Sequence, residues 1–246
     1  MAEASSVEEV VWIAGVGASA GLGAALARRF ARAGLTAVVT GRTPERLELV
    51  AREIREAGGR AYAEPGDVRL EAELTRIAAR VSQIGHLRVA IYNASSAVRA
   101  PSLEISAGDF EDAWRTTTLG GFLFARESVR ALLPSGGALF FTGATASLRG
   151  KPPFTAFAAA KAGLRSVSQS FAREFGPRGV HVAHVIIDGG IDGERWRTRA
   201  RERGEQPSSD GLLGLDAISE AYFQLYAQDR SAWTQELDLR PYREPF

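Results

Sequence analysis

The sequence predicts an α/β fold, in which one doubly wound parallel sheet of about seven strands is flanked by helices. Three observations support this expectation. A glycine-rich turn joins an apolar run to a helical pattern near the start of the chain, short apolar runs then alternate with amphipathic stretches, and no change of composition marks a boundary in the 246 residues. We therefore expect a single Rossmann-type domain over residues 1–246.

The glycine turn is the most informative stretch. An apolar run at 10–16 is followed by Gly17, Gly21 and Gly23, and a helical pattern then continues to residue 34. Glycine lets a phosphate approach the backbone without a Cβ in the way, and the free N–H groups at a helix start attract an anion. The arrangement favours dinucleotide binding, although a plain tight turn between strand and helix stays an alternative.

Further elements follow from apolar spacing. We expect helices at 43–58, 70–84, 109–133, 154–176 and 216–228, and later strands at 38–39, 60–64, 86–92, 138–142, 179–187 and 236–239. The first of these helices has Thr43 as a candidate cap. Residues 188–210 are glycine-rich and then strongly charged, so the sequence predicts a mobile loop, about 188–214, over a substrate.

Composition excludes several classes. A net charge of +1 gives no reason to expect nucleic acid or an anionic membrane as partner, and there is no cysteine for disulfides or thiolate metal sites. Only three histidines are present, so no metal site is expected. The acidic N-terminus lacks a signal-peptide pattern, which makes a cytoplasmic location the expectation. Of 30 basic residues only Lys151 and Lys161 are lysine, a bias typical of GC-rich bacterial genomes.

The spacing Gly-x-x-x-Gly-x-Gly resembles that of the short-chain dehydrogenase/reductase family, and Tyr92-Asn93-Ala94-Ser95 is similar to the family's Asn-Asn-Ala-Gly. The resemblance covers residues 10–240 and implies a nicotinamide cofactor. It implies that Asn93 steadies the sheet and that Asp67 binds the adenine amino group, although a helix cap is an equal alternative for Asp67. The cofactor-binding residues it implies are Gly17, Ser19, Gly21, Leu22, Gly23, Arg42, Asp67, Val68, Asn93, Ala94, Lys161, Gly190 and Ile191.

Arg42 bears on which nicotinamide cofactor is bound. The second strand ends in Thr40-Gly41-Arg42, with no carboxylate to bind the adenosine ribose hydroxyls. An arginine there would pair with a 2′-phosphate, so we expect NADP(H) rather than NAD(H). A solvated surface arginine is the competing interpretation.

The catalytic positions depart from the family. The family uses Tyr-x-x-x-Lys on one helix face, a Ser thirteen residues before the Tyr, and an Asn on the preceding helix. This chain keeps Lys161, but Phe157, Ala144 and Thr117 stand at the Tyr, Ser and Asn positions. A phenyl ring donates no proton, so carbonyl reduction should be weak or unconventional. Two hypotheses stay open: an oxidoreductase acting on an unknown carbonyl or alcohol, and a cofactor-binding sensor or partner protein without hydride chemistry.

Other groups could replace the missing hydroxyls. The candidates are Thr142, Thr145, Ser147, Thr155, Ser95, Ser96 and the carboxylate of Asp188, although each also suits a turn or cap. His181 and His184 should point to opposite faces of one strand, which prevents them from sharing an ion. The long apolar helix at 109–133, which in the family often pairs between subunits, implies a homodimer or homotetramer.

Overall fold

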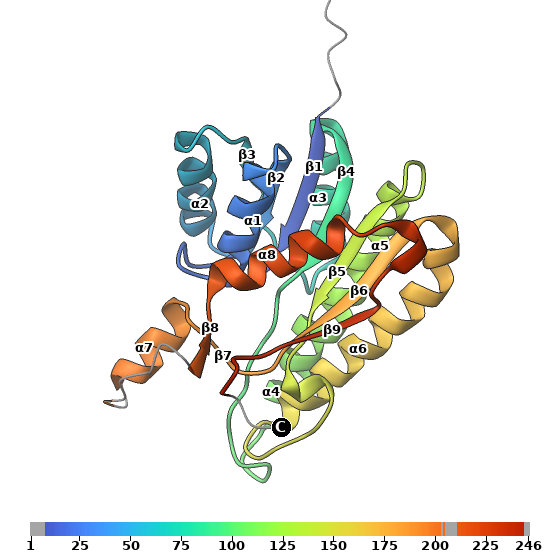
Figure 1. Cartoon of the computed structure of the whole chain (residues 1–246). Helices are drawn as coiled ribbons and strands as arrows, with labels where there is room; N and C mark the ends of the chain where they lie inside the picture. The colour runs from blue at the N-terminus through green and yellow to red at the C-terminus, as the bar shows by residue number, and fades with distance from the viewer. Residues whose placement is uncertain (1–7, 203, 205–210, 244–246) are drawn as a thin grey trace, which may run out of the picture.

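The computed structural model describes residues 8–202, 204 and 211–243, and it has one seven-stranded parallel sheet in the order β3-β2-β1-β4-β5-β6-β9. Helices cover both faces of this sheet (Figure 1). The predicted doubly wound α/β fold is confirmed.

The elements alternate along the chain as the sequence indicates. The strands are β1 (Glu9–Ala14), β2 (Thr36–Thr40), β3 (Ala61–Ala63), β4 (His86–Tyr92), β5 (Gly137–Thr142), β6 (Val180–Ile187), β7 (Gly190–Ile191), β8 (Leu212–Leu213) and β9 (Glu236–Leu239). The α-helices are α1 (Leu22–Arg32), α2 (Pro44–Glu56), α3 (Glu71–Ile84), α4 (Ala107–Trp114), α5 (Gly120–Leu132), α6 (Thr155–Phe175), α7 (Glu194–Glu202) and α8 (Leu215–Tyr226).

Strand alternation divides the core into two layers. Val11 and Ile13 of β1 pack with α1, α2 and α8, whereas Val10 and Trp12 pack with α3, α5 and α6. All four side chains have no exposed surface, because helices cover both faces of the strand. The central strands therefore read as continuous apolar runs in the sequence.

The direction of winding reverses at β1. From β1 the chain passes to β2 and β3 on one side, and it then returns to β4 and continues through β5, β6 and β9 on the other. In sheets of this kind, ligands bind in the crevice beyond the carboxyl ends of the strands at such a reversal. The glycine turn that follows Ala14 lies there.

The helix expected at 109–133 is interrupted. Between α4 and α5 the residues Arg115–Leu119 form one π-helical turn, which contains Thr117. The wider turn leaves the carbonyl of Thr116 free to accept a hydrogen bond from the Tyr92 hydroxyl. Thr43 precedes α2 as expected, but its side chain makes no capping hydrogen bond.

Much of the segment expected to be a loop at 188–214 has regular structure. β7 and β8 form a small parallel sheet, and α7 lies between them in sequence, apart from the main helix layers (Figure 1). The amide of Glu194 donates to the carbonyl of Ala20, 2.8 Å away, which anchors the start of α7 to the glycine turn. Residues 203 and 205–210 of the expected loop lie outside the described residues. Within the part of the chain that the structure describes, no helix is long and apolar enough to cross a bilayer.

Candidate active site

A cleft of about 1590 Å³ opens at the carboxyl ends of the strands. It collects most of the predicted site residues, and the two exceptions are Ser19 and Thr117. Those that line it are Gly17, Gly21, Leu22, Gly23, Arg42, Asp67, Val68, Asn93, Ala94, Ala144, Phe157, Lys161, Gly190 and Ile191. Residues from seven separate segments of sequence therefore form one continuous wall.

The glycine turn fits a bound dinucleotide because its glycines have different tasks. A Cβ on Gly17 would meet no atom within 4 Å, so this residue presents bare backbone to the cleft. A Cβ on Gly23 would lie 2.8 Å from the carbonyl oxygen of Gly15, so this glycine lets α1 pack closely against the strand. Asn93 closes the turn from β4, because its Nδ2 donates to the same Gly15 oxygen over 3.0 Å. This contact joins the end of β4 to the turn after β1.

Ser19 lies in the turn but does not face the cleft. Its hydroxyl donates to the Glu53 carboxylate over 2.7 Å and accepts from the Arg28 guanidinium over 2.5 Å. Arg28 and Ser19 together lower the pKa of Glu53. Ser19 thus ties the glycine turn to α2 instead of offering its hydroxyl to a ligand.

The wall beyond β2 carries two cations. Arg42 and Arg46 line the cleft with exposed side chains, and neither has an ion-pair partner within the described chain. Nearby, Asp67 is held by Arg69 at 2.6 Å. Desolvation raises the pKa of Asp67, but the hydrogen bonds from Arg69 outweigh it and lower the pKa overall. The residue at the cap position of α3 is Leu70, so the alternative interpretation of Asp67 as a helix cap is not supported.

Lys161 lies at the base of the cleft on α6. Only 3% of the residue is exposed, and its Nζ donates to the main-chain carbonyl of Thr142 over 2.6 Å. Burial lowers the pKa of Lys161 to about 7. The Phe157 ring, one helical turn earlier, has its centroid 5.8 Å from Nζ. The ammonium group is therefore poised between charged and neutral forms beside hydrocarbon.

The side chains at the other three catalytic positions present no proton donor to the cleft. Phe157 and Ala144 present only carbon atoms to the cleft. Thr117 has no exposed surface, and its Oγ1 accepts from the amide of Ser96 over 3.3 Å inside the π-helical turn. At position 117 the chain therefore differs from the family pattern in residue type, and the side chain also lies outside the cleft lining.

Two of the candidate replacement hydroxyls are already engaged. Thr142 shares a 2.8 Å hydrogen bond with Tyr222 of α8, in the core on the other side of the sheet. Thr145 donates to the carboxylate of Asp188. Only 2% of Asp188 is exposed, and its carboxylate forms an ion pair with Arg240 at 3.1 Å. It is therefore not a free base at the mouth of the cleft.

Among the candidate hydroxyls that line the cleft, Ser95 is the one without a hydrogen-bond partner in the described structure, whereas Ser96 lies outside the lining. Ser147 accepts the amide of Ala144 over 3.1 Å, and Thr155 bonds Ser102 at the surface over 2.6 Å. By contrast, the Oγ of Ser95 is buried in the cleft wall and has no hydrogen-bond partner in the described part of the chain. Its donor capacity is therefore unused in the described structure.

The two strand histidines face opposite layers, as predicted. His181 stacks on Trp233 with centroids 4.8 Å apart, and its Nε2 lies 2.9 Å from the Thr234 carbonyl. His184 is fully buried on the α6 side, with Nδ1 3.2 Å from Glu236 Oε2. Burial lowers the pKa of His184 to about 4, so the ring is neutral.

Sequence reasoning missed several residues of the cleft. Gly15 has φ +91°, and a Cβ there would lie 2.2 Å from the Ala94 nitrogen. Arg46, Arg149 and Lys151 also line the wall. The additional glycine before Gly17 and the scarcity of lysine were the signals that could have identified Gly15 and Lys151. Arg46 and Arg149 carry no such signal, because arginine is abundant in this chain.

Comparison with known proteins agrees with this geometry. The family model described as short chain dehydrogenase matches residues 10–203. The short-chain dehydrogenase/reductase eriH of Hericium erinaceus is 32% identical over 171 residues, which are 67% of this chain and 68% of that protein. A short-chain dehydrogenase from Rhodopseudomonas palustris is 39% identical with a TM-score of 0.81, over 95% of this chain and 99% of the other.

An alcohol dehydrogenase from Thermococcus sibiricus, solved with 5-hydroxy-NADP, is 25% identical with a TM-score of 0.83, over 97% of this chain and 100% of the other. The cleft described above contains the glycine turn and Lys161, the two features that this chain shares with the family pattern. The chain therefore belongs to the short-chain dehydrogenase/reductase family.

Proposed function

We propose that this protein is an NADP(H)-dependent oxidoreductase that acts on a carbonyl or alcohol group, with a slow or unconventional proton transfer. The observation that carries the proposal is the cleft itself. A glycine turn presents open backbone at Gly17, and the same wall ends at the buried ammonium group of Lys161. This pairs an anion-binding turn with a group that can hold ribose hydroxyls.

The preference for NADP(H) over NAD(H) is supported by charge. Arg42 and Arg46 lie on the wall after β2, and no ion pair within the described residues neutralises either one. A 2′-phosphate accepts bidentate hydrogen bonds from a guanidinium, whereas ribose hydroxyls are better served by a carboxylate. The Thermococcus sibiricus relative, whose complex contains 5-hydroxy-NADP, is consistent with this choice.

The chemistry follows from which groups can move a proton. When bound, the nicotinamide exchanges a hydride with the carbonyl or alcohol carbon. Lys161, with its pKa lowered to about 7 by burial, can hold or release a proton at Nζ near neutral pH. Phe157 and Ala144 contribute only apolar surface, and Ser95 supplies a hydroxyl that can donate a hydrogen bond to a carbonyl oxygen. Loss of a positioned acid lowers a rate about 10²–10⁴-fold.

Fluorescence titration with NADPH and NADH, followed by turnover on aldehydes and ketones, tests the proposal. We expect binding of both cofactors with tighter binding of NADPH, and slow turnover that depends on Ser95. The variant Ser95→Ala should lose turnover while keeping NADPH affinity, and Ser102→Ala, which removes an exposed hydroxyl, is its control. Absence of NADPH binding would overturn the proposal.

A second function is favoured by one observation. Phe157, Ala144 and Thr117 together remove every family proton donor or carbonyl-polarising side chain except Lys161. A protein that binds NADP(H) as a sensor or partner subunit, without hydride transfer, would keep the same cleft. NADPH binding without turnover on any carbonyl of the panel would select this function.

We further propose that the protein is a homodimer or homotetramer in the cytoplasm, assembled through α4 and α5. Phe110, Trp114 and Phe122 on these helices expose about two fifths of their surface, at 40%, 42% and 39%. Phe124 turns inward and is buried, so the helices have one face for the core and another that is apolar and uncovered within one chain.

A further inference from the structure

Two basic side chains stand where no phosphate of a dinucleotide is expected. Arg149 and Lys151 lie on the loop between β5 and α6 and line the main cleft. Arg42 and Arg46, which suit a 2′-phosphate, follow β2. Between β2 and β5 lie β1 and β4, so the strands that precede the two pairs are three strand spacings apart, about 14 Å. The glycine turn that suits a pyrophosphate follows β1, between them.

The two cations of the β5 side exceed the negative charge beside them. Lys151 is exposed, and its ammonium group has no hydrogen bond or ion pair with any described residue. The nearest carboxylate to Arg149 is Asp188, 3.9 Å away. That carboxylate is already bound by Thr145 and by Arg240. Other arginines have a much closer acidic partner, as in the pair Arg28–Glu53 at 2.6 Å. An unpaired lysine beside an arginine that has only a distant share in one carboxylate gives the cleft wall a net positive charge, which attracts an anion.

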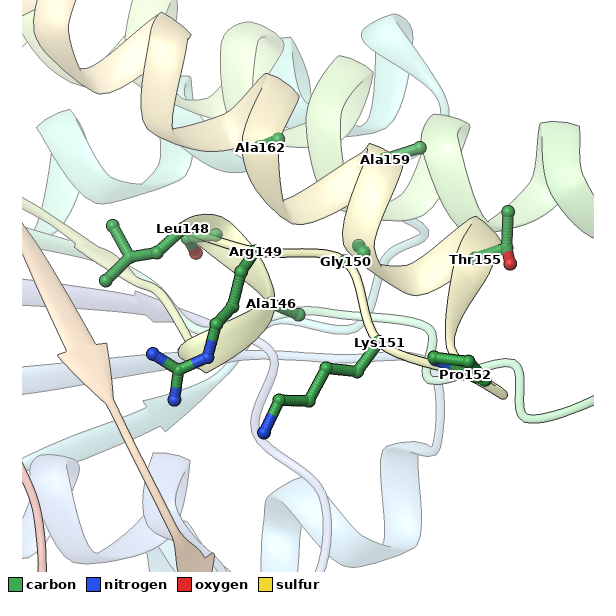
Figure 2. A pocket seen from close by; sticks show the side chains of 11 residues that line it. Ala146, Leu148, Arg149, Gly150, Lys151, Pro152, Thr155, Ala159 and Ala162 are labelled. Carbon is green, nitrogen blue, oxygen red and sulfur yellow. The ribbon is translucent and has the colours of Figure 1, made fainter. Parts of the chain in front are cut away.

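The direction of the two side chains is shared. Figure 2 shows Arg149 and Lys151 extending the same way from their loop, away from Ala159 and Ala162 of α6. On the helix side of the loop lies a smaller pocket of about 430 Å³, lined mostly by small residues, and the two cations border both it and the main cleft. The two cations therefore lie where the smaller pocket meets the main cleft, whose wall also contains Phe154 and Phe157.

The basic residues of α7 are a different case. Arg195 and Arg199 also line the cleft, but the start of α7 is bonded to Ala20 of the glycine turn. Partial desolvation, and then the positive charge of Arg199, lower the pKa of Arg195. Their position beside the turn suits cofactor phosphates, which leaves Arg149 and Lys151 as the pair available to a substrate.

We propose that the substrate carries an anionic group, a carboxylate or a phosphate, which Arg149 and Lys151 bind while its carbonyl lies beside Phe157 and Lys161. This inference rests on the proposed function, because it assigns a charge to the substrate of the same cleft. The apolar wall at Phe154 and Phe157 receives the body of the substrate, and the two cations fix its charged end.

The test uses the whole protein saturated with NADP⁺, in which an aldehyde cannot be reduced. Calorimetry compares three probes with the same aldehyde: 4-carboxybenzaldehyde, 4-formylphenyl phosphate and the neutral methyl 4-formylbenzoate. We expect at least one anionic probe to bind about tenfold more tightly than the ester, with the advantage shrinking as salt is added. The tighter of the two anions identifies carboxylate or phosphate as the group.

Variants assign the effect to the pair. Lys151→Met and Arg149→Gln should each weaken binding of the preferred anion about tenfold and leave the ester and NADPH affinities unchanged. Arg173→Gln, which removes the same charge from an exposed site far along α6, should change none of them. Equal binding of ester and anions overturns the inference, as does a loss of NADPH affinity in either variant, which would assign the cations to the cofactor.

Turnover with NADPH separates this inference from the proposed function. An anionic probe that binds through the pair but is never reduced contradicts the oxidoreductase proposal and supports the anion site. Reduction of all three probes with equal KM supports the oxidoreductase proposal and contradicts the anion site.

Discussion

The His184 ring occupies, beneath α6, the space that a side chain at Gly143 would need: a Cβ added to Gly143 would lie 2.4 Å from His184 Nε2. His184 has no exposed surface, and its other nitrogen faces Glu236. Gly143 directly precedes Ala144, which occupies the family's serine position. The histidine therefore excludes any side chain at 143 and fixes the backbone of the segment that forms the floor of the cleft.

Gly143→Ala should destabilise the protein by about 1–3 kcal/mol, because the methyl group overlaps the buried imidazole. In the double variant Gly143→Ala/His184→Ala, part of that loss should be recovered, with a coupling energy of about 1 kcal/mol or more. Urea denaturation of the four proteins of the cycle measures both values. Strictly additive effects of the two substitutions on the free energy of unfolding would contradict a steric overlap between residues 143 and 184.

The same histidine should make the protein sensitive to acid. Its pKa falls from 6.5 to about 4 on folding because of burial, so between these values the unfolded chain binds the proton and the native state does not. The free energy of unfolding should therefore decrease as the pH is lowered from 6.5 towards 4, by about 2–3 kcal/mol from this group. His184→Gln should flatten this part of the pH profile, whereas His86→Gln, at an exposed position, should leave it as steep as in the native protein.

Lys161 should act in the same direction, but at higher pH. Burial lowers its pKa from 10.5 to about 7, so between these values the unfolded chain holds a proton that the native state has lost. Stability should rise with pH across this window. Lys161→Met should be more stable than the native protein at pH 7 and below, should lose the rise above it, and should bind NADPH more weakly. Lys151→Met, the only other lysine, should leave the pH profile unchanged, and a destabilised Lys161→Met protein would contradict the argument.

The double variant Phe157→Tyr/Ala144→Ser should gain carbonyl reductase activity of at least about 10²-fold in kcat/KM, because it restores a proton donor and a polarising hydroxyl. Loss of NADPH absorbance with an aldehyde measures the rate. Each single variant should gain less, since the two groups act together. Phe175→Tyr adds the same hydroxyl at the far end of α6 and should gain nothing. Native turnover that the double variant fails to exceed would show that protons reach the substrate by another route.

Phe122→Glu should lower the mass of the particle in solution, because it charges the uncovered face of α5. Light scattering measures this mass. Leu49→Glu makes the same change at an exposed residue of α2, with 37% of its surface exposed, and should leave the assembly intact. A native protein that is already monomeric would contradict an assembly through α5.

The sequence was sufficient for the fold because its signals are local. The glycine turn, the apolar runs and the helical spacing each depend on neighbours a few residues away, and they indicated every strand of the main sheet. The positions of Lys161, Phe157 and Ala144 in one cleft followed from the family resemblance. Contacts between distant residues were not predictable, because nothing near Thr142 in sequence indicates that its hydroxyl bonds Tyr222.

The same limit explains the individual errors. Ser19 suits a phosphate site by position, but Arg28 and Glu53 come together only in the folded chain and take its hydroxyl. Thr117 was assigned to the cleft from its register on a regular helix, and the π-helical turn changes the direction of the side chains within it. The charge of residues 188–210 predicted a loop, whereas anchoring to Ala20 gives α7 a fixed start.

Asp188 has a practical consequence. Its carboxylate accepts from Thr145, beside the floor of the cleft, and pairs with Arg240, just after the last strand. The segment just after β9 is thus linked to the floor of the cleft through the Asp188 carboxylate. A purification tag or fusion partner at the carboxyl terminus would act close to that link, so recombinant work on this protein is better served by a tag at the amino terminus.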